Sequence, residues 1–277
     1  MTAQYLVPER LYGIIGYPLG HSLSPKLHNW AFAQQGLPAA YYRWPLPGDS
    51  MAAFMLSLRT LPIHGLSVTI PHKQRVIPNL DGLTEQALQS GAVNTLFWID
   101  GKLYGENTDC TGFAAPISGL SLKPESAVIL GAGGACRACI VGLKGLRTSK
   151  IWVCARNETK ARQVADQLEV DTWPWSARGD LRADLLINAT PLGMSGKWAD
   201  QSAYKSPEEL KGFKLVYDLI YNPLETPLVQ QAKSAGCQVI SGLEMFLHQA
   251  AEQYRLWSGT VFDLDQARNL LQAWLSS

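Results

Sequence analysis

Hydrophobic and polar positions follow two different patterns, and the change comes near residue 112. Before it, short strands and helices are mixed, and their β-branched and aromatic residues predict strands at 11–17, 40–46 and 65–70. After residue 120, apolar strands alternate regularly with helices, and further strands are expected at 184–190, 214–220 and 237–240. This predicts an α/β fold whose second part is a doubly wound parallel sheet with helices on both faces.

Turn residues place several boundaries in the first part. Ser24 as N-cap with Pro25 at the first helical position predicts a helix start, and Gly36 predicts its end. The pair Asp100-Gly101 stands between two apolar runs and fits a two-residue hairpin turn. Because the open ends of a hairpin are neighbours, Asn94 and Asp109 should come close together.

Composition points to a protein whose partner is a small molecule in a pocket. The 277 residues suggest about two domains, and 47% hydrophobic and 17% charged residues fit a globular chain. A net charge of +1 offers nothing to nucleic acid or an anionic membrane surface. The N-terminus lacks a basic start and an apolar segment, and no apolar run could span a bilayer, so a cytoplasmic protein is expected.

Cysteine and histidine spacing predicts neither disulfides nor a metal site. The five cysteines are scattered and odd in number, and Cys136 and Cys139 form a C-x-x-C inside an expected helix without a second pair. No two histidines have a spacing that would let both rings reach one metal ion.

The segment SAVILGAGGACRACIVGL combines a strand, a glycine turn and a helix, which is the context of a dinucleotide-binding fingerprint. Its glycines are Gly131, Gly133 and Gly134, and the small Cys136 takes the third glycine position. Backbone N–H groups and the helix dipole would hold a pyrophosphate. The alternative is a glycine turn that binds nothing.

The residues after the next strand indicate which dinucleotide is bound. NAD sites normally place an acid there for the ribose 2′-hydroxyl, but this chain has Ala155, Arg156 and Asn157, with Lys160 on the same helix face as Arg156. These cations suit a 2′-phosphate and predict NADP. The alternative is a solvated helix start.

The other strand ends and the last long helix supply further candidates. A parallel sheet binds ligands at the carboxyl ends of its strands, which here carry Thr190, Leu219, Tyr221 and Gly242. Met245 and Gln249 lie one helical turn apart at the edge of an apolar stripe. As an alternative, Gln249 is an ordinary surface amide.

At this point the chain resembles the shikimate dehydrogenase family over almost its whole length. The resemblance rests on the segments GYPLGHSLSPKLHN, SVTIPHK, GAVNTL, GENTDCTGF, GAGGACRA, ARNETKA, NATPLGM, YDLIYNPLETPL and GLEMFLHQA. It implies reversible reduction of 3-dehydroshikimate to shikimate by NADPH in aromatic amino-acid biosynthesis. With the change of pattern near residue 112, the chain is expected to form a substrate-binding domain of residues 1–112 with C-terminal helices 243–277 and a Rossmann-like NADP domain of residues 113–242. Because neither domain shows an interface stripe, a monomer and a homodimer both stay open.

The resemblance assigns roles to individual residues. The catalytic pair is Lys73 and Asp109, where Lys73 meets the charge that develops on the carbonyl oxygen and supplies its proton. The substrate contacts would be Ser22, Ser24, Ser67, Thr69, Lys73, Asn94, Asp109, Tyr221 and Gln249. The cofactor contacts would be Glu85, Gly131, Ala132, Gly133, Gly134, Ala135, Ala155, Arg156, Asn157, Lys160, Thr190, Leu219, Gly242 and Met245.

Two departures from the family pattern, and two other functions, stay open. Ser67 stands where members usually have asparagine, and Ala155 removes one polar phosphate contact. Glu85 has a role at a helix start as an alternative. A quinate dehydrogenase of broader specificity and a non-catalytic ligand sensor share the expected architecture. Ser22 and Ser24 favour shikimate over quinate, and retention of Lys73 with Asp109 argues against a sensor.

Overall fold

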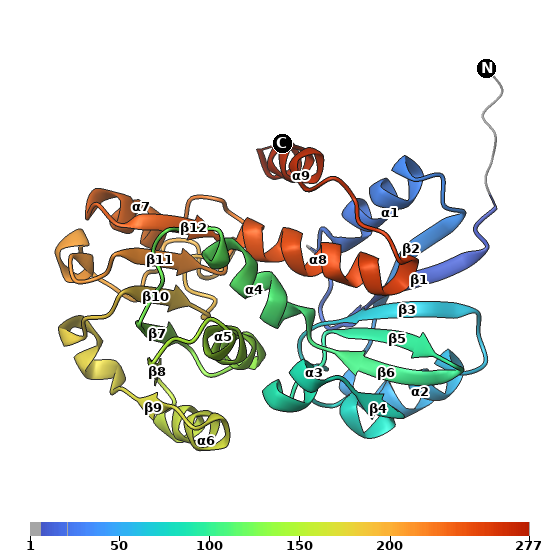
Figure 1. Ribbon diagram of the computed structural model, residues 1–277, viewed down its shortest axis with the longest axis horizontal. Helices are drawn as coiled ribbons and strands as arrows, with labels where there is room; N and C mark the ends of the chain where they lie inside the picture. Colours follow the sequence, from blue (N-terminus) through green and yellow to red (C-terminus); the bar gives the residue numbers. More distant parts are fainter. Residues whose placement is uncertain (1–6, 21, 277) are drawn as a thin grey trace. The chain divides into compact units, whose positions relative to one another are not determined.

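The structure, a computed structural model, describes residues 7–20 and 22–276, and its strands form two six-stranded sheets (Figure 1). The chain divides into two units, each built around one sheet. Unit 1 holds the chain up to Thr108 and Ala250–Ala267, and unit 2 holds Asp109–Gln249 and the chain from Arg268 onward. Among these described residues, no helix is both long and apolar enough to cross a membrane.

Unit 1 is built on a mixed sheet in the order β2-β1-β3-β5-β6-β4. Strand β1 is parallel to β2 and β3, whereas β5 is antiparallel to β3 and β6. The strands are β1 (Arg10–Gly16), β2 (Ala39–Pro45), β3 (Ile63–Val68), β4 (Gly82–Leu83), β5 (Thr95–Ile99) and β6 (Lys102–Glu106). The helices are α1 (Ser24–Gln34), α2 (Met51–Leu58) and α3 (Glu85–Ser90), with short 3-10 turns at Gly48–Ser50 and Ile77–Asn79.

The predicted turns of unit 1 hold with one correction. Asp100 and Gly101 have φ angles of 48° and 73°, and this pair of positive values is what the predicted hairpin turn requires. Gly36, with φ of 63°, follows the end of α1 as expected. The prediction that Ser24 is the N-cap is wrong, because α1 begins at Ser24 and Leu23 takes the cap position without a side-chain bond.

Unit 2 is built on a fully parallel sheet in the order β12-β11-β10-β7-β8-β9, which confirms the predicted doubly wound fold. Its strands are β7 (Ser126–Leu130), β8 (Lys150–Cys154), β9 (Asp171–Thr172), β10 (Leu185–Asn188), β11 (Leu215–Asp218) and β12 (Gln238–Ser241). The helices that lie wholly or partly in this unit are α4 (Thr108–Ser118), α5 (Gly134–Gly145), α6 (Glu158–Leu168), α7 (Pro227–Ser234), α8 (Gly242–Ser258) and α9 (Leu264–Ser276), with 3-10 turns at Trp175–Asp180 and Pro207–Leu210. Thr108 of α4, the second half of α8 from Ala250 and the start of α9 up to Ala267 belong to unit 1.

Helices cover both faces of this sheet because its strands are apolar on both sides. Ile129 of β7 packs in one core with Phe113 of α4 and Ile140 of α5, while the next residue, Leu130, packs on the other face with Leu228 of α7. The strand order reverses between β7 and β10. In open parallel sheets, ligands bind at the carboxyl ends of the strands beside such a reversal.

The division into units differs from the predicted domains at the ends of α4 and α8. Residues 109–112 and 243–249 fall in unit 2, as does the chain from Arg268 onward. Met245 belongs to the core of unit 2, and Gly112 of α4 lies directly against Gln249 of α8. In addition, Arg268 of α9 pairs with Glu244 at 2.8 Å.

Candidate functional site

Lys73 follows a tight turn at the carboxyl end of β3. The Thr69 carbonyl accepts from the His72 amide at 2.8 Å, which closes the turn around Pro71. The buried His72 ring bonds the Leu46 carbonyl at 2.6 Å, and the Val93 amide donates to the Lys73 carbonyl at 2.8 Å. His72 is therefore an anchor for the turn, and it holds the half-buried Lys73 next to the segment that contains Asn94.

Asn94 connects this turn to the start of α4. Its Oδ1 accepts from the Thr108 amide at 2.8 Å, and its Nδ2 donates to the Thr108 hydroxyl at 3.0 Å. Asp109 is the next residue, in the first turn of α4, and is buried. The hairpin of β5 and β6 thus brings Asn94 to the residue that precedes Asp109, as the turn at Asp100-Gly101 predicted.

The other predicted substrate residues of unit 1 lie at the same edge of its sheet. Gly16 ends β1 directly against Thr69, and a Cβ at Gly16 would come within 2.3 Å of the threonine methyl group. Ser22 accepts from the Ser24 amide at 3.3 Å, and Ser24 is buried in the first turn of α1. Strands β1 and β3 therefore end where these polar side chains gather.

Ser67 points elsewhere. Its hydroxyl accepts from the Tyr41 hydroxyl at 2.6 Å and donates to Gln253 Oε1 at 2.8 Å, and the residue is only 4% exposed. These two partners are buried as well. Direct contact between Ser67 and a substrate stays a prediction, and the observed bonds indicate a role inside unit 1 instead.

Three candidates of unit 2 lie on or near α8. Gln249 is buried and donates to the Phe246 carbonyl at 3.0 Å, so it is not the surface amide considered as the alternative. The Tyr221 ring packs 5.0 Å from that of Phe246, and burial raises the pKa of its hydroxyl, which stays protonated and able to donate. Met245 is buried in the core of the unit.

The glycine turn after β7 has the features of a dinucleotide cradle. Gly131 has φ of 105°, and a Cβ there would lie 2.8 Å from the Ala189 carbonyl oxygen, so only glycine fits without strain. Gly133 is the N-cap of α5 and supplies no side-chain cap, and a Cβ on it would meet nothing within 4 Å. Behind the turn, Ala132 and Cys136 are buried. No side chain at the N-cap position thus competes for the first amides of α5, and the space beside Gly133 is open, as pyrophosphate binding at a helix N-terminus requires.

Neighbouring strand ends continue this cradle. After β10, the Thr190 hydroxyl donates to Asn188 Oδ1 at 2.6 Å. After β12, Gly242 lies so close to Leu219 that a Cβ would come within 2.2 Å of its carbonyl oxygen. Gly134 and Ala135 open α5 and are half-buried. These predicted cofactor residues thus lie at the carboxyl edge of one sheet.

The cations expected to recognise a 2′-phosphate follow β8. Arg156 is exposed, and its guanidinium carbon lies 5.8 Å from the ring centroid of Trp198. Asn157 caps α6 by accepting from the Lys160 amide at 2.9 Å, and the preceding Ala155 is buried. Trp198 was not foreseen, because it lies in the loop after β10 and no local pattern connects it with Arg156.

Glu85 lies in unit 1 at the start of α3. Its carboxylate is exposed and accepts from Gln89 at 2.9 Å, one turn further along the helix. An acidic residue in the first turn also suits the helix dipole. This placement favours the helix-start role that was the alternative, and cofactor contact by Glu85 stays a prediction.

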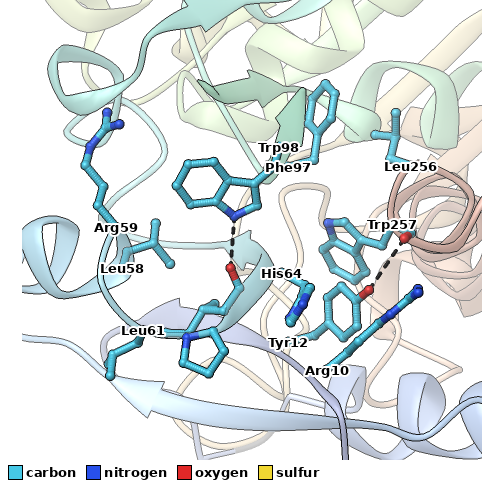
Figure 2. Close-up of a pocket in the computed structure, with 12 residues that line it drawn as sticks. Arg10, Tyr12, Leu58, Arg59, Leu61, His64, Phe97, Trp98, Leu256 and Trp257 are labelled. Atoms are coloured by element: carbon cyan, nitrogen blue, oxygen red, sulfur yellow. Dashed lines mark hydrogen bonds between the residues drawn. The ribbon is translucent and has the colours of Figure 1, made fainter. Parts of the chain in front are cut away.

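A cavity of about 400 Å³ lies at the opposite edge of the unit 1 sheet, where β1 and β3 begin. Figure 2 shows that polar groups in its wall already have partners: Trp98 donates to the Ile63 carbonyl and Tyr12 to that of Trp257. None of the predicted site residues lines this cavity. The candidate site therefore stays at the carboxyl ends of the strands.

Comparison with known proteins decides the family. Residues 14–96 match the family described as the shikimate dehydrogenase substrate binding domain, and residues 242–272 match the shikimate 5'-dehydrogenase C-terminal domain. A shikimate dehydrogenase (NADP(+)) from Maridesulfovibrio salexigens is 47% identical over 264 residues, covering 95% of this chain and 97% of the relative. The chain belongs to the shikimate dehydrogenase family. The predicted resemblance is confirmed.

Solved structures of the shikimate dehydrogenase family share the whole fold. The Thermus thermophilus enzyme in complex with NADP(H) and shikimate superposes with a TM-score of 0.85 at 32% identity, covering 95% of this chain and 98% of that chain. A quinate dehydrogenase from Corynebacterium glutamicum in complex with NAD superposes with a TM-score of 0.86 at 31% identity, covering 95% of this chain and 98% of that one. The fold is thus shared by enzymes named for two related substrates.

Proposed function

We propose that this chain catalyses the reversible NADPH-dependent reduction of 3-dehydroshikimate to shikimate, a step of aromatic amino-acid biosynthesis. The observation that carries the proposal is the 47% identity to a shikimate dehydrogenase (NADP(+)) over nearly the full length of both chains. The half-buried Lys73 and the Asn94 to Thr108 bonds beside Asp109 give that similarity a chemical basis.

Lys73 is the residue that acts on the carbonyl in this proposal. Reduction of a ketone builds negative charge on its oxygen, and a cationic donor both stabilises that charge and supplies the proton. Asp109 is its catalytic partner and also holds a substrate hydroxyl. Around them, Ser22 and Ser24 bind the carboxylate, while Thr69, Asn94, Tyr221 and Gln249 bind hydroxyls or the ring.

NADP is the cofactor in this proposal and supplies the hydride when bound. The open start of α5 at Gly133 and the positive φ of Gly131 support pyrophosphate binding. Ala155, Arg156 and Asn157 stand directly after β8, where NAD sites place an acid for the ribose 2′-hydroxyl. Together with Lys160, Arg156 supports binding of a 2′-phosphate. Thr190, Leu219 and Gly242 at neighbouring strand ends, and Met245 in the first turn of α8, complete the proposed cofactor contacts.

The second candidate function is a quinate dehydrogenase, favoured by the similarity to the Corynebacterium glutamicum enzyme. Quinate has an additional hydroxyl on the carbon that bears the carboxylate, so residues beside the carboxylate decide between the two. Ser22 and the buried Ser24 lie close together at the start of α1, which supports shikimate.

Assays with each combination of cofactor and substrate test the proposal. Purified protein is mixed with NADP+ or NAD+ and with shikimate or quinate, and formation of the reduced cofactor is followed by absorbance. We expect the highest kcat/KM for shikimate with NADP+. Preference for quinate would support the second candidate, and shikimate binding without turnover would support a ligand sensor.

Cellular location and oligomeric state belong to the same proposal. The five cysteines, all within the described residues, form no disulfide, which supports a reducing compartment such as the cytoplasm. We expect a monomer or a homodimer, and light scattering distinguishes them.

A further inference from the structure

Gln253 of α8 reaches into the sheet of unit 1 between β3 and β5. Its Oε1 accepts from Ser67 of β3 at 2.8 Å, and its Nε2 donates to the Thr95 hydroxyl of β5 at 2.9 Å. Ser67 and Thr95 face each other across the two strands, so Gln253 bridges this pair. Nε2 also donates to the Asn94 carbonyl at 3.2 Å. With 2% exposure, the Gln253 carboxamide is shielded from water.

The bonds form one directional chain that ends at Asn94. Tyr41 donates to Ser67, and Ser67 donates to Gln253. Gln253 Nε2 in turn donates to the Thr95 hydroxyl oxygen, and the Thr95 hydroxyl donates its own hydrogen bond to Asn94 Oδ1 at 2.7 Å. Each hydroxyl has a single proton, so the direction of every bond is determined by its neighbours.

This direction decides which way the Asn94 carboxamide faces. Oδ1 accepts from the Thr95 hydroxyl and the Thr108 amide, and Nδ2 donates to the Thr108 hydroxyl at 3.0 Å. If the carboxamide were flipped, its NH₂ group would face the Thr95 hydroxyl and the Thr108 amide, which are both donors, and both hydrogen bonds would be lost. Leaving a buried donor unpaired is costly, so the chain of bonds holds one orientation.

We infer that Gln253 is a positioning residue for the proposed reaction, acting through Thr95 to keep Asn94 Nδ2 presented as a donor to a substrate hydroxyl. The inference rests on the proposed function, in which Asn94 binds the substrate. Gln253 itself does not touch the substrate. Ser67 then acts as the support of Gln253 rather than as a substrate contact.

Ser67 and Gln253 form a complementary pair in this account. The family resemblance leads to asparagine at position 67, and this longer side chain would extend toward the Gln253 carboxamide, which bonds Ser67 in this chain. The two buried side chains touch through the 2.8 Å bond, so a larger side chain at position 67 is expected to crowd Gln253. The short serine is thus matched by the long glutamine.

Replacing Gln253 by leucine tests the positioning role. Gln253→Leu keeps similar bulk but removes both ends of the bridge, and we expect kcat/KM for shikimate to fall about tenfold or more, mainly through KM. The Kd for NADP+ should change by less than about twofold, since the cofactor residues are untouched. The exposed Gln272→Leu of α9 is the matched control and should keep wild-type kinetics.

Changing both residues of the pair separates a positioning role from an effect on protein stability. Ser67→Asn alone should raise KM for shikimate through crowding, and Ser67→Asn combined with Gln253→Ala should recover most of the loss. Thermal unfolding is recorded for each variant. If Gln253→Leu keeps wild-type kcat/KM while it lowers Tm, Gln253 is a purely structural residue and the inference is overturned.

Failure of the proposed function would look different. It would show in the wild type, as absent turnover of shikimate with NADP+. In that case shikimate binding is measured by tryptophan fluorescence, and a weaker Kd in Gln253→Leu than in the wild type still supports the positioning role. Equal Kd values, or no binding by the wild type, overturn it.

Discussion

Lys73 is the residue on which the proposed chemistry depends most directly. We expect Lys73→Ala to lower kcat by about two orders of magnitude or more, because the developing oxyanion loses its proton donor. The Kd for NADP+ should stay close to that of the wild type, since no residue of the glycine turn changes. Kinetics with shikimate and a fluorescence titration with NADP+ measure the two effects. Lys102→Ala, an exposed lysine of the same unit, is the control, and a nearly normal kcat in Lys73→Ala would refute the assignment.

Arg156 decides the preference for NADP over NAD in the proposal. A guanidinium–phosphate bond is charge-assisted, so Arg156→Ala should raise KM for NADP+ about tenfold or more and leave KM for NAD+ almost unchanged. The exposed Arg162→Ala on α6 controls for loss of positive charge nearby. Equal effects on the two cofactors would contradict the role of Arg156.

His28 gives a pH-dependent test of the core of unit 1. It is fully buried, its ring stacks 4.7 Å from that of Tyr41, and burial lowers its pKa from 6.5 to about 3. Below about pH 6.5, His28 is protonated in the unfolded chain but stays neutral in the folded protein, so the free energy of unfolding decreases as the pH falls from 6.5 toward 3.

The comparison of His28→Phe with the wild type isolates this effect. Phenylalanine does not titrate, so the free energy of unfolding of the wild type, relative to that of His28→Phe, should fall by about 2 kcal/mol between about pH 7 and about pH 5. Chemical denaturation at several pH values measures the difference. A constant difference over that range would mean that folding does not perturb the pKa of His28.

At the scale of elements, the turn between β7 and α5 shows what a strand–turn–helix unit demands. Gly131→Ala would place an alanine at a positive φ angle, which L-residues rarely adopt, and would bring its Cβ within 2.8 Å of the Ala189 carbonyl oxygen. We expect the free energy of unfolding to fall by about 1–3 kcal/mol and KM for NADP+ to rise, as measured by denaturation and kinetics. Gly145→Ala at the end of α5 is the control, because a Cβ there meets nothing within 4 Å. If both variants behave alike, the turn has no special requirement for glycine.

Several elements were predictable because their determinants are local. The hairpin of β5 and β6 follows from Asp100 and Gly101, and both residues have the positive φ angles that the turn needs. The start of α1 was predicted one residue too late, since Ser24 is already helical and does not cap the helix. A proline and a serine mark the neighbourhood of a helix start, but tertiary contacts of the first turn set the boundary.

At the scale of the whole molecule, cofactor binding should stabilise the folded chain. NADP+ at about one hundred times its Kd adds about 2.7 kcal/mol to the free energy of unfolding if it binds only the folded state. We therefore expect a clear rise in Tm with NADP+ and a smaller rise with the same concentration of NAD+, measured by differential scanning fluorimetry. Arg156→Ala should reduce the NADP+ shift alone. Identical shifts for both cofactors in the wild type would argue against 2′-phosphate recognition.

The sequence by itself determined the parallel sheet of unit 2, the hairpin of β5 and β6, the glycine turn and the family. These depend on residue type and spacing over short stretches: hydrophobic patterns predict strands, glycine predicts turns, and Ala155, Arg156 and Asn157 directly after β8, in place of an acid, favour NADP. Lys73 could be named because it follows a strand, and Asn94 and Asp109 because they flank the two open ends of one hairpin.

Only the tertiary structure decided what the side chains touch. Ser67 was predicted as a substrate contact, yet its hydroxyl bonds Gln253, which lies 186 residues away in the sequence. Trp198 reaches Arg156 in the same way, from a loop that follows a different strand. Strand order and helix packing create such neighbours, and no local pattern encodes them. That is why the sequence named the residues of the proposed reaction, while the fold was needed to find the residue that orients one of them.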